Sequence, residues 1–157
     1  MTEPRSFAFR PRYRALAWAA VGVGGALSVA SAIALAAMIP IASGVIGVGL
    51  GAAYLMSPMW RLEVVIDDSA LEVRSARGSK FRVAWPDVVR VVASPTTHTC
   101  FVDGGAPECS LIVPGLGAPA PYDLADKHAL YDAIVAHVDP SKIETVDTLD
   151  AARAAAT

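Results

Sequence analysis

The sequence predicts a membrane α-helical hairpin followed by an α+β domain, in which a small antiparallel sheet or barrel is capped by a C-terminal helix. Three observations predict this fold. Residues 15–60 contain no Asp, Glu, Lys or Arg, although 18% of the 157 residues are charged. Residues 61–113 hold short apolar runs, several of them alternating, separated by turn-forming residues. Residues 122–138 then carry apolar side chains at helical spacing.

The charge-free block is too long for a single span. Its 46 residues would make a helix of about 69 Å, more than twice the roughly 30 Å of bilayer hydrocarbon. Pro40 disfavours helix in the residue before it, so we expect a break there and two spans, at 15–38 and 41–59. A cleaved signal peptide is the main alternative for the first span, because Ala32-Ile33-Ala34 is a small-x-small sequence. The length of the apolar stretch disfavours that alternative.

Basic residues at the ends of the block predict its orientation. Residues 1–14 form a basic N-terminus with four arginines, and four more basic residues follow the second span. By the positive-inside rule, both termini face the cytoplasm. We therefore expect two spans, with the connection between them on the far side of the membrane. These residues are Arg5, Arg10, Arg12 and Arg14 on one side and Arg61, Arg74, Arg77 and Lys80 on the other.

Small residues recur at four-residue spacing in both spans and would let helix backbones approach closely. They are Gly22, Ala26, Ala30 and Ala34 in the first span, and Gly47 and Gly51 in the second. Packing within the hairpin is the favoured interpretation, and a homo-oligomer is the alternative. Because the block has no ionisable residue, a transporter or pump acting alone is not expected.

The part after Trp60 is predicted to be a cytoplasmic domain over residues 61–138. Two strands flank a turn at Asp67-Asp68, and about six short strands are expected in all. The helix at 122–138 follows, and Asp139-Pro140 ends it. In the tail, residues 139–157, the pattern Ser141-x-x-Glu144 is a capping box that favours a short helix.

The sequence Phe81-Arg82-Val83-Ala84-Trp85-Pro86-Asp87-Val88-Val89-Arg90-Val91, placed after two N-terminal spans, resembles the bacterial pleckstrin-homology-like (PH-like) membrane proteins of the YcxB-like kind. In that group a strand runs into a Trp/Tyr-x-Asp-Ile/Val turn, and an apolar strand follows. The resemblance implies a PH-like fold, which is a bent seven-stranded sheet with a C-terminal helix. It implies no catalytic residues.

No combination of residues in the sequence indicates a particular chemical reaction. His98, Cys100 and Cys109 lack the spacing of a metal site, and on a cytoplasmic domain the two cysteines are expected as reduced thiols. There is no glycine-rich phosphate loop and no nucleophile beside a base. We therefore expect a protein that is not an enzyme and uses no cofactor and no metal.

Four basic residues are candidates for binding anionic lipid headgroups: Arg74, Arg77, Lys80 and Arg82. A solvated strand face that discourages edge pairing is the competing interpretation. From residue 61 on there are nine basic and fourteen acidic residues, a net charge of −5, which disfavours nucleic acid as a partner.

With the resemblance to bacterial PH-like proteins, the sequence thus predicts a membrane-anchored, non-catalytic interaction or scaffold module of a bacterial cell inner membrane. Its expected partners are the lipid bilayer and a protein that docks at a strand edge or beside the helix at 122–138. A reader of anionic lipid headgroups and a small structural membrane oligomer are the alternatives.

Overall fold

The structure is a computed structural model, and it describes residues 4–33, 38–116, 118 and 120–147. Two compact units make up the chain. One is the continuous segment Pro11–Trp60, and the other combines Met1–Arg10 with Arg61–Thr157. The first unit is helical and the second contains the sheets, so the predicted combination of an apolar helical pair and an α+β part is confirmed.

The helical unit consists of α1 (Arg14–Ile33) and α2 (Met38–Leu55), and a 3-10 turn, η1 (Pro58–Arg61), follows. Both helical stretches are long and apolar enough, by length and composition, to cross a membrane. The second helix begins at Met38, before the predicted break, so Pro40 lies in its first turn. Proline is tolerated there because its missing N–H would have no partner in the helix anyway.

Small residues bring the two helices together. A Cβ added to Gly24 would lie 2.7 Å from the carbonyl oxygen of Gly44, and a Cβ on Gly51 would lie 2.8 Å from that of Ala17. Ser28 Oγ also donates a hydrogen bond of 3.4 Å to the carbonyl oxygen of Ile41. The backbones therefore approach within a distance that only glycine permits at these positions.

The small residues picked from the sequence divide between this interface and the outer face. Gly47 and Gly51 of α2 face α1, because a Cβ added to either would lie within 4 Å of an α1 carbonyl oxygen. Gly22 has nothing within 4 Å of its Cβ position, and Ala26 and Ala30 are exposed. Ala34 is outside the described residues. The row of α1 that packs is offset from the predicted one and includes Ala17 and Gly24.

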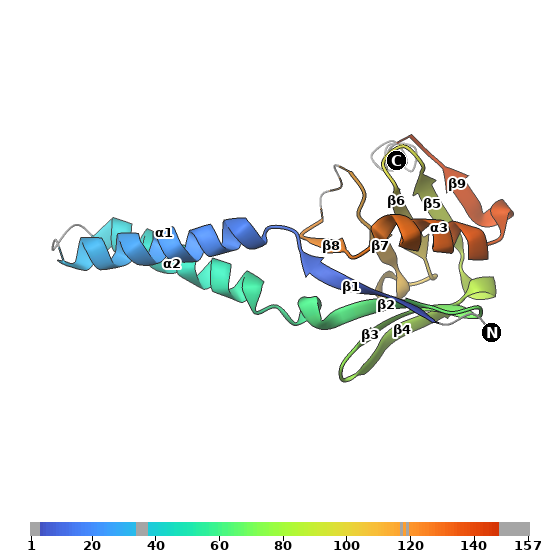
Figure 1. The fold of residues 1–157 in the computed structure, drawn as a ribbon, viewed down its shortest axis with the longest axis horizontal. Helices are drawn as coiled ribbons and strands as arrows, with labels where there is room; N and C mark the ends of the chain where they lie inside the picture. Colours follow the sequence, from blue (N-terminus) through green and yellow to red (C-terminus); the bar gives the residue numbers. More distant parts are fainter. Residues whose placement is uncertain (1–3, 34–37, 117, 119, 148–157) are drawn as a thin grey trace. The chain divides into compact units, whose positions relative to one another are not determined.

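The larger sheet has the order β4-β3-β2-β1-β8 (Figure 1). The β1–β2, β2–β3 and β3–β4 pairs are antiparallel. Its strands are β1 (Arg5–Pro11), β2 (Leu62–Ile66), β3 (Ala70–Ser75), β4 (Gly78–Ala84) and β8 (Tyr122–Leu124). The predicted hairpin around the turn at Asp67-Asp68 is the β2–β3 pair.

Strand β1 was not predicted, because residues 1–14 were interpreted only as a basic N-terminus. Phe7 and Phe9 are 4% and 7% exposed, and the residues between and beside them are exposed, as expected for a strand with one buried face. Arg5 pairs with Ile66 and Ala8 with Glu63. The helical unit is therefore inserted between two neighbouring strands of one sheet.

The smaller sheet has the order β7-β6-β5-β9. Its strands are β5 (Arg90–Ser94), β6 (Thr99–Asp103), β7 (Leu111–Val113) and β9 (Ile143–Thr145), and β9 pairs with β5 in parallel. The described residues thus contain nine strands rather than six. Within them the two sheets remain separate, so they do not form the single closed barrel that was one of the predicted forms.

The C-terminal helix is shorter than predicted. Residues Tyr122–Leu124 are strand β8, and α3 (Lys127–His137) begins only after Asp126, whose left-handed conformation (φ 47°) separates the two elements. The helix buries Leu130 and Ile134 completely. It therefore still supplies the apolar face that its spacing predicted.

The short helix expected from the capping box does not form. Asp139 accepts hydrogen bonds from the backbone N and the Oγ of Ser141, which stabilises a 3-10 turn, η4 (Pro140–Lys142). The chain then continues as β9. Because the backbone N and the hydroxyl of Ser141 already donate to Asp139, Ser141 does not cap a helix. The pairing of β9 with β5 then outweighs the local preference for a helix. The sheet unit therefore extends beyond the predicted limits of 61–138 at both ends.

We expect Gly24→Ala to destabilise the helical pair by about 1–3 kcal/mol, because the added Cβ would lie too close to the Gly44 carbonyl oxygen. Titration of the detergent-solubilised protein with SDS, followed by circular dichroism, measures this effect. Gly22→Ala is the matched control and should be neutral or slightly stabilising, since its Cβ meets nothing within 4 Å. Equal unfolding midpoints for the two variants would contradict the interface.

Candidate interaction surfaces

The four predicted lipid-binding residues belong to the β3–β4 hairpin but do not form one free cluster. Arg74 Nε lies 2.6 Å from Glu63 Oε1. Arg82 lies 3.2 Å from an oxygen of Asp67 and 3.7 Å from one of Glu72. The hydrogen bond from Arg74 lowers the pKa of Glu63, so this carboxylate stays charged and neutralises its partner.

The other two hairpin residues, Arg77 and Lys80, are exposed, and neither side chain has a hydrogen bond or ion pair with the described residues; only the backbone N of Arg77 donates, to Ser75 Oγ at 3.3 Å. The register places them near two further cations. Leu62 pairs with Ser75, and Ser75 pairs with Gly78, so Arg61 and Arg77 lie at the same end of the sheet. Ala8 pairs with Glu63, which brings Arg10 to that end as well.

We call these four exposed cations, Arg10, Arg61, Arg77 and Lys80, the basic rim. None of the four side chains has a hydrogen bond or ion pair with the residues that the structure describes. The rim therefore differs from the predicted set by two members: the neutralised Arg74 and Arg82 are replaced by Arg10 and Arg61.

The opposite end of the sheet is acidic and is fixed by the turn between β2 and β3. Asp67 Oδ1 accepts hydrogen bonds from the N and Oγ of Ser69 and from the N of Ala70, at 2.6–2.8 Å. These bonds, led by the one from the Ser69 hydroxyl, lower the pKa of Asp67. Trp85 Nε1 donates to the Asp67 carbonyl oxygen at 3.0 Å, which ties the turn to the end of β4.

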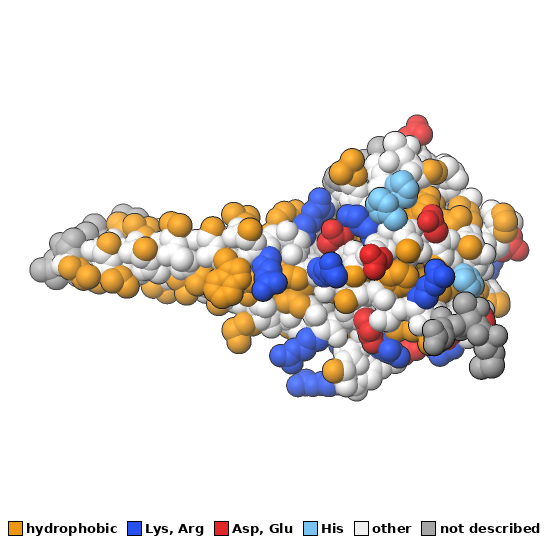
Figure 2. All heavy atoms as spheres, viewed as in Figure 1, with side chains coloured by type: hydrophobic (Ala, Val, Ile, Leu, Met, Phe, Trp, Pro, Cys, Tyr) orange, Lys and Arg blue, Asp and Glu red, His pale blue; other side chains and the backbone are white. Residues whose placement is uncertain are grey.

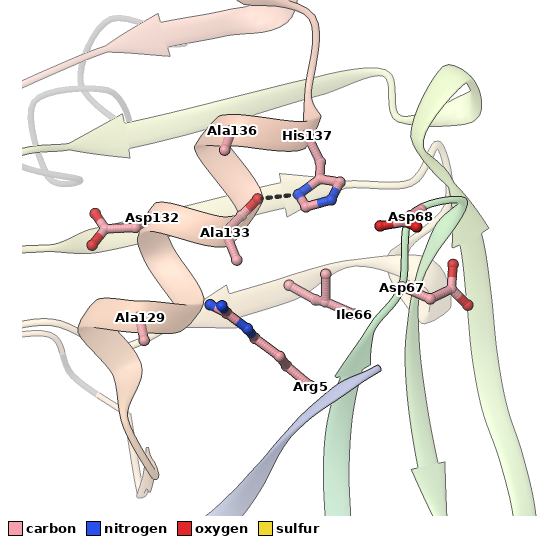
Figure 3. Close-up of a pocket in the computed structure, with 9 residues that line it drawn as sticks. All are labelled: Arg5, Ile66, Asp67, Asp68, Ala129, Asp132, Ala133, Ala136 and His137. Carbon is pink, nitrogen blue, oxygen red and sulfur yellow. Dashed lines mark hydrogen bonds between the residues drawn. The ribbon is translucent and has the colours of Figure 1, made fainter. Parts of the chain in front are cut away.

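A groove of about 380 Å³ lies beside α3 at this acidic end (Figure 3). Three alanines at i, i+4 and i+7 supply its wall on the helix: Ala129, Ala133 and Ala136. Arg5 of β1 extends toward them. Polar residues at its margin are Asp67 and Asp68 of the β2–β3 turn, with Asp132 and His137 of α3.

Contacts at the C-terminal end of α3 join it to the segment that follows β4, which is a 3-10 turn, η2 (Trp85–Asp87), and Val88. The His137 ring stacks on Trp85 with centroids 5.0 Å apart, and its Nδ1 lies 2.7 Å from the carbonyl oxygen of Ala133. Lys142 Nζ donates to the carbonyl oxygens of Pro86 and Val88 at 2.6 and 2.7 Å. This segment therefore contacts the chain both before and after Val138.

Two of the remaining histidines contact each other. The rings of His98 and His128 stack with centroids 4.4 Å apart and planes at 7°. Both cysteines are free, and burial raises the pKa of Cys100 to about 12. No group of three potential ligands that could hold a metal ion occurs in the described part of the chain.

Arg5, Arg10 and Arg61 were not identified as surface candidates from the sequence. All three depend on β1: Arg5 and Arg10 lie on it, and Arg61 is adjacent to Arg10 only because β1 pairs with β2. The alternation of Phe7 and Phe9 with polar or small residues is the signal that could have identified the strand.

A scan against protein-family models, a search of curated proteins and a search of solved structures each found no match. The surfaces are therefore interpreted from their own geometry.

The lowered pKa of Asp67 predicts an acid-sensitive turn. Because this pKa is lower in the folded than in the unfolded chain, the stabilisation is complete above about pH 4 and is lost as the pH falls through the folded value. Asp67→Asn should destabilise the sheet unit at pH 7 and reduce the loss of stability on acidification. Proteolysis of the β2–β3 region between pH 3 and 7 measures both effects. A variant that keeps the wild-type pH dependence would contradict this role.

Proposed function

We propose that the chain is a membrane-anchored, non-catalytic interaction module of a bacterial inner membrane, with both termini in the cytoplasm. One observation carries the proposal: β1 and β2 are neighbours in one sheet, and the whole helical unit lies between them in the sequence. Paired strands must be on the same side of a membrane. An inserted helical pair must therefore leave and re-enter at the same face, which two spans allow and one span does not.

The exposed side chains of the helical unit support insertion into a bilayer. Leu16, Val23 and Ile33 are 68%, 69% and 79% exposed, and Figure 2 shows apolar side chains along this unit while charged ones gather over the sheets. A continuous apolar surface of this kind is disfavoured in water. In a bilayer the same surface would contact acyl chains.

Aromatic residues support the position of the membrane boundary at the ends of the helices that join the sheet unit. The Tyr54 and Trp60 rings lie 5.0 Å apart, and the Tyr54 hydroxyl accepts a hydrogen bond of 3.0 Å from the Tyr13 backbone N. Tyrosine and tryptophan are enriched at the headgroup level, where one part of the ring is wet and the other apolar. Arginines on the same side favour the cytoplasm.

The sheet unit is the part that would bind partners. Two small sheets, one of them mixed, and a helix near the C-terminus are compatible with a PH-like module, in the sense of a scaffold that presents surfaces rather than a reaction centre. The separate sheets and the added strands β1 and β9 are departures from the seven-stranded form.

The groove beside α3 is the docking site that we propose for a protein partner. The alanines leave room for a small apolar side chain, and the Arg5 guanidinium can donate to a backbone carbonyl oxygen. Asp68 and Asp132 at the margin favour a basic side chain. The proposed occupant is therefore a peptide segment that carries Lys or Arg.

Topology can be tested with reporters at both termini. We expect green fluorescent protein to fluoresce and alkaline phosphatase to remain inactive when either is fused before Met1 or after Thr157. Alkaline carbonate should leave the protein in the membrane pellet. Phosphatase activity at only one terminus would contradict the proposal, because β1 and β2 could not then pair.

Docking can be tested in cells with a photoreactive benzophenone at Ala133. We expect a discrete crosslinked product, and no such product from the exposed Ala76. Asp68→Lys combined with Asp132→Lys should abolish the product by charge repulsion. The matched pair Asp87→Lys and Asp147→Lys, which makes the same change in charge at exposed positions outside the groove, should retain it. If the crosslinked product still forms when Asp68 and Asp132 are both replaced by Lys, the occupant of the groove is not basic.

A further inference from the structure

The basic rim is a concentration of positive charge for which the described residues offer no counter-charge. Arg10 lies on β1, Arg61 directly before β2, Arg77 in the β3–β4 turn and Lys80 on β4, so the rim spreads along one end of four neighbouring strands. Neighbouring strands are about 4.8 Å apart, and like charges repel one another within a Debye length of about 10 Å. Arg74 and Arg82, in the same hairpin, each have a carboxylate partner. The rim side chains are therefore available to an external anion in a way that Arg74 and Arg82 are not.

Chain connectivity limits how far the rim can lie from the helices. Arg10 is four residues before Arg14, where α1 begins, and Arg61 directly follows Trp60. Four residues span at most about 14 Å, even when fully extended. Arg77 and Lys80 are distant in the sequence, but the register brings their turn to the strand end beside Arg61. If the helices span a bilayer, Arg10 and Arg61 are within reach of its headgroups, and Arg77 and Lys80 belong to the same end of the sheet as Arg61.

We propose that the basic rim binds the anionic phospholipid headgroups of the membrane in which the helices are inserted. This inference rests on the proposed membrane anchoring and adds the lipid class and the residues that contact it. The rim contributes guanidinium and ammonium groups, which suit phosphate oxygens. Lipid fits this position better than an acidic protein does, because the anchor holds the rim at the bilayer surface permanently.

Acylation of lysines in the full chain tests the contact. The chain is reconstituted in vesicles of pure phosphatidylcholine or of phosphatidylcholine with phosphatidylglycerol. It is treated with a neutral acetylating reagent at about 0.1 M salt, where the Debye length is about 10 Å, and analysed by mass spectrometry. A surface potential of about −30 to −50 mV concentrates protons and lowers the reactive amine fraction about three- to sevenfold. We expect Lys80 to react more slowly by that factor in the anionic vesicles.

Lys142 is the internal control. It donates to the carbonyl oxygens of Pro86 and Val88, which follow β4. The strand from Lys80 to its last residue, Ala84, is already about 13 Å long, which exceeds the Debye length of about 10 Å. The rate of Lys142 should therefore be nearly the same in both vesicles. Equal slowing of Lys80 and Lys142, or no slowing of Lys80, would overturn the inference.

A matched pair of variants separates local contact from net charge. Arg77→Glu and the double variant Ala129→Glu, Ala136→Glu both change the net charge by −2, but only the first changes the rim. The quantity to compare is the Lys80 acetylation rate in phosphatidylcholine vesicles divided by the rate in anionic vesicles. We expect this ratio to fall toward one in Arg77→Glu and to stay high in the double variant. Loss in both would overturn the inference. Carbonate extraction of the same vesicles distinguishes the two proposals: protein that is extracted refutes anchoring, whereas retained protein without Lys80 slowing refutes only the lipid contact.

Discussion

The pairing of β1 with β2 is the contact on which the rest of the structure depends. It joins residues about 60 positions apart in the sequence, such as Arg5 and Ile66, and closes a loop that contains the entire helical unit. Closing so long a loop costs conformational entropy, and the burial of Phe7 and Phe9 offsets part of that cost. The same pairing creates the basic rim and places Arg5 at the groove. Without β1, neither surface would exist in its present form.

The two helices show a second constraint, which is how closely their backbones approach. Apolar side chains alone give no preference for one helix face over another inside a bilayer, because lipid is equally apolar. Close contact at Gly24, Gly44 and Gly51 supplies that preference. The outward faces are then left to the larger side chains, such as Val23 and Leu50.

Sequence patterns predicted those elements whose signals are local. The charge-free block, the turn at Asp67-Asp68 and the apolar face of α3 were all recognisable from spacing and turn chemistry. The failures occurred where a distant partner decides the structure. Ser141 and Glu144 follow a local helix rule, but pairing with β5 makes residue 144 part of a strand. The rim could not be predicted because it depends on strand register, and two of the four expected cations are neutralised by carboxylates from other positions.

The insertion of the helical unit between paired strands also has a consequence for biogenesis. Strand β1 is synthesised first, yet its partner β2 emerges only after both helices have been made. In a membrane, the sheet could close only when the hairpin has inserted with both ends on one side. A hairpin inserted in any other way would leave β1 on the wrong side and Val64 and Ile66 with an uncovered edge, which is a feature that chaperones and proteases recognise. The sheet unit could thus fold completely only in chains whose hairpin has the correct topology.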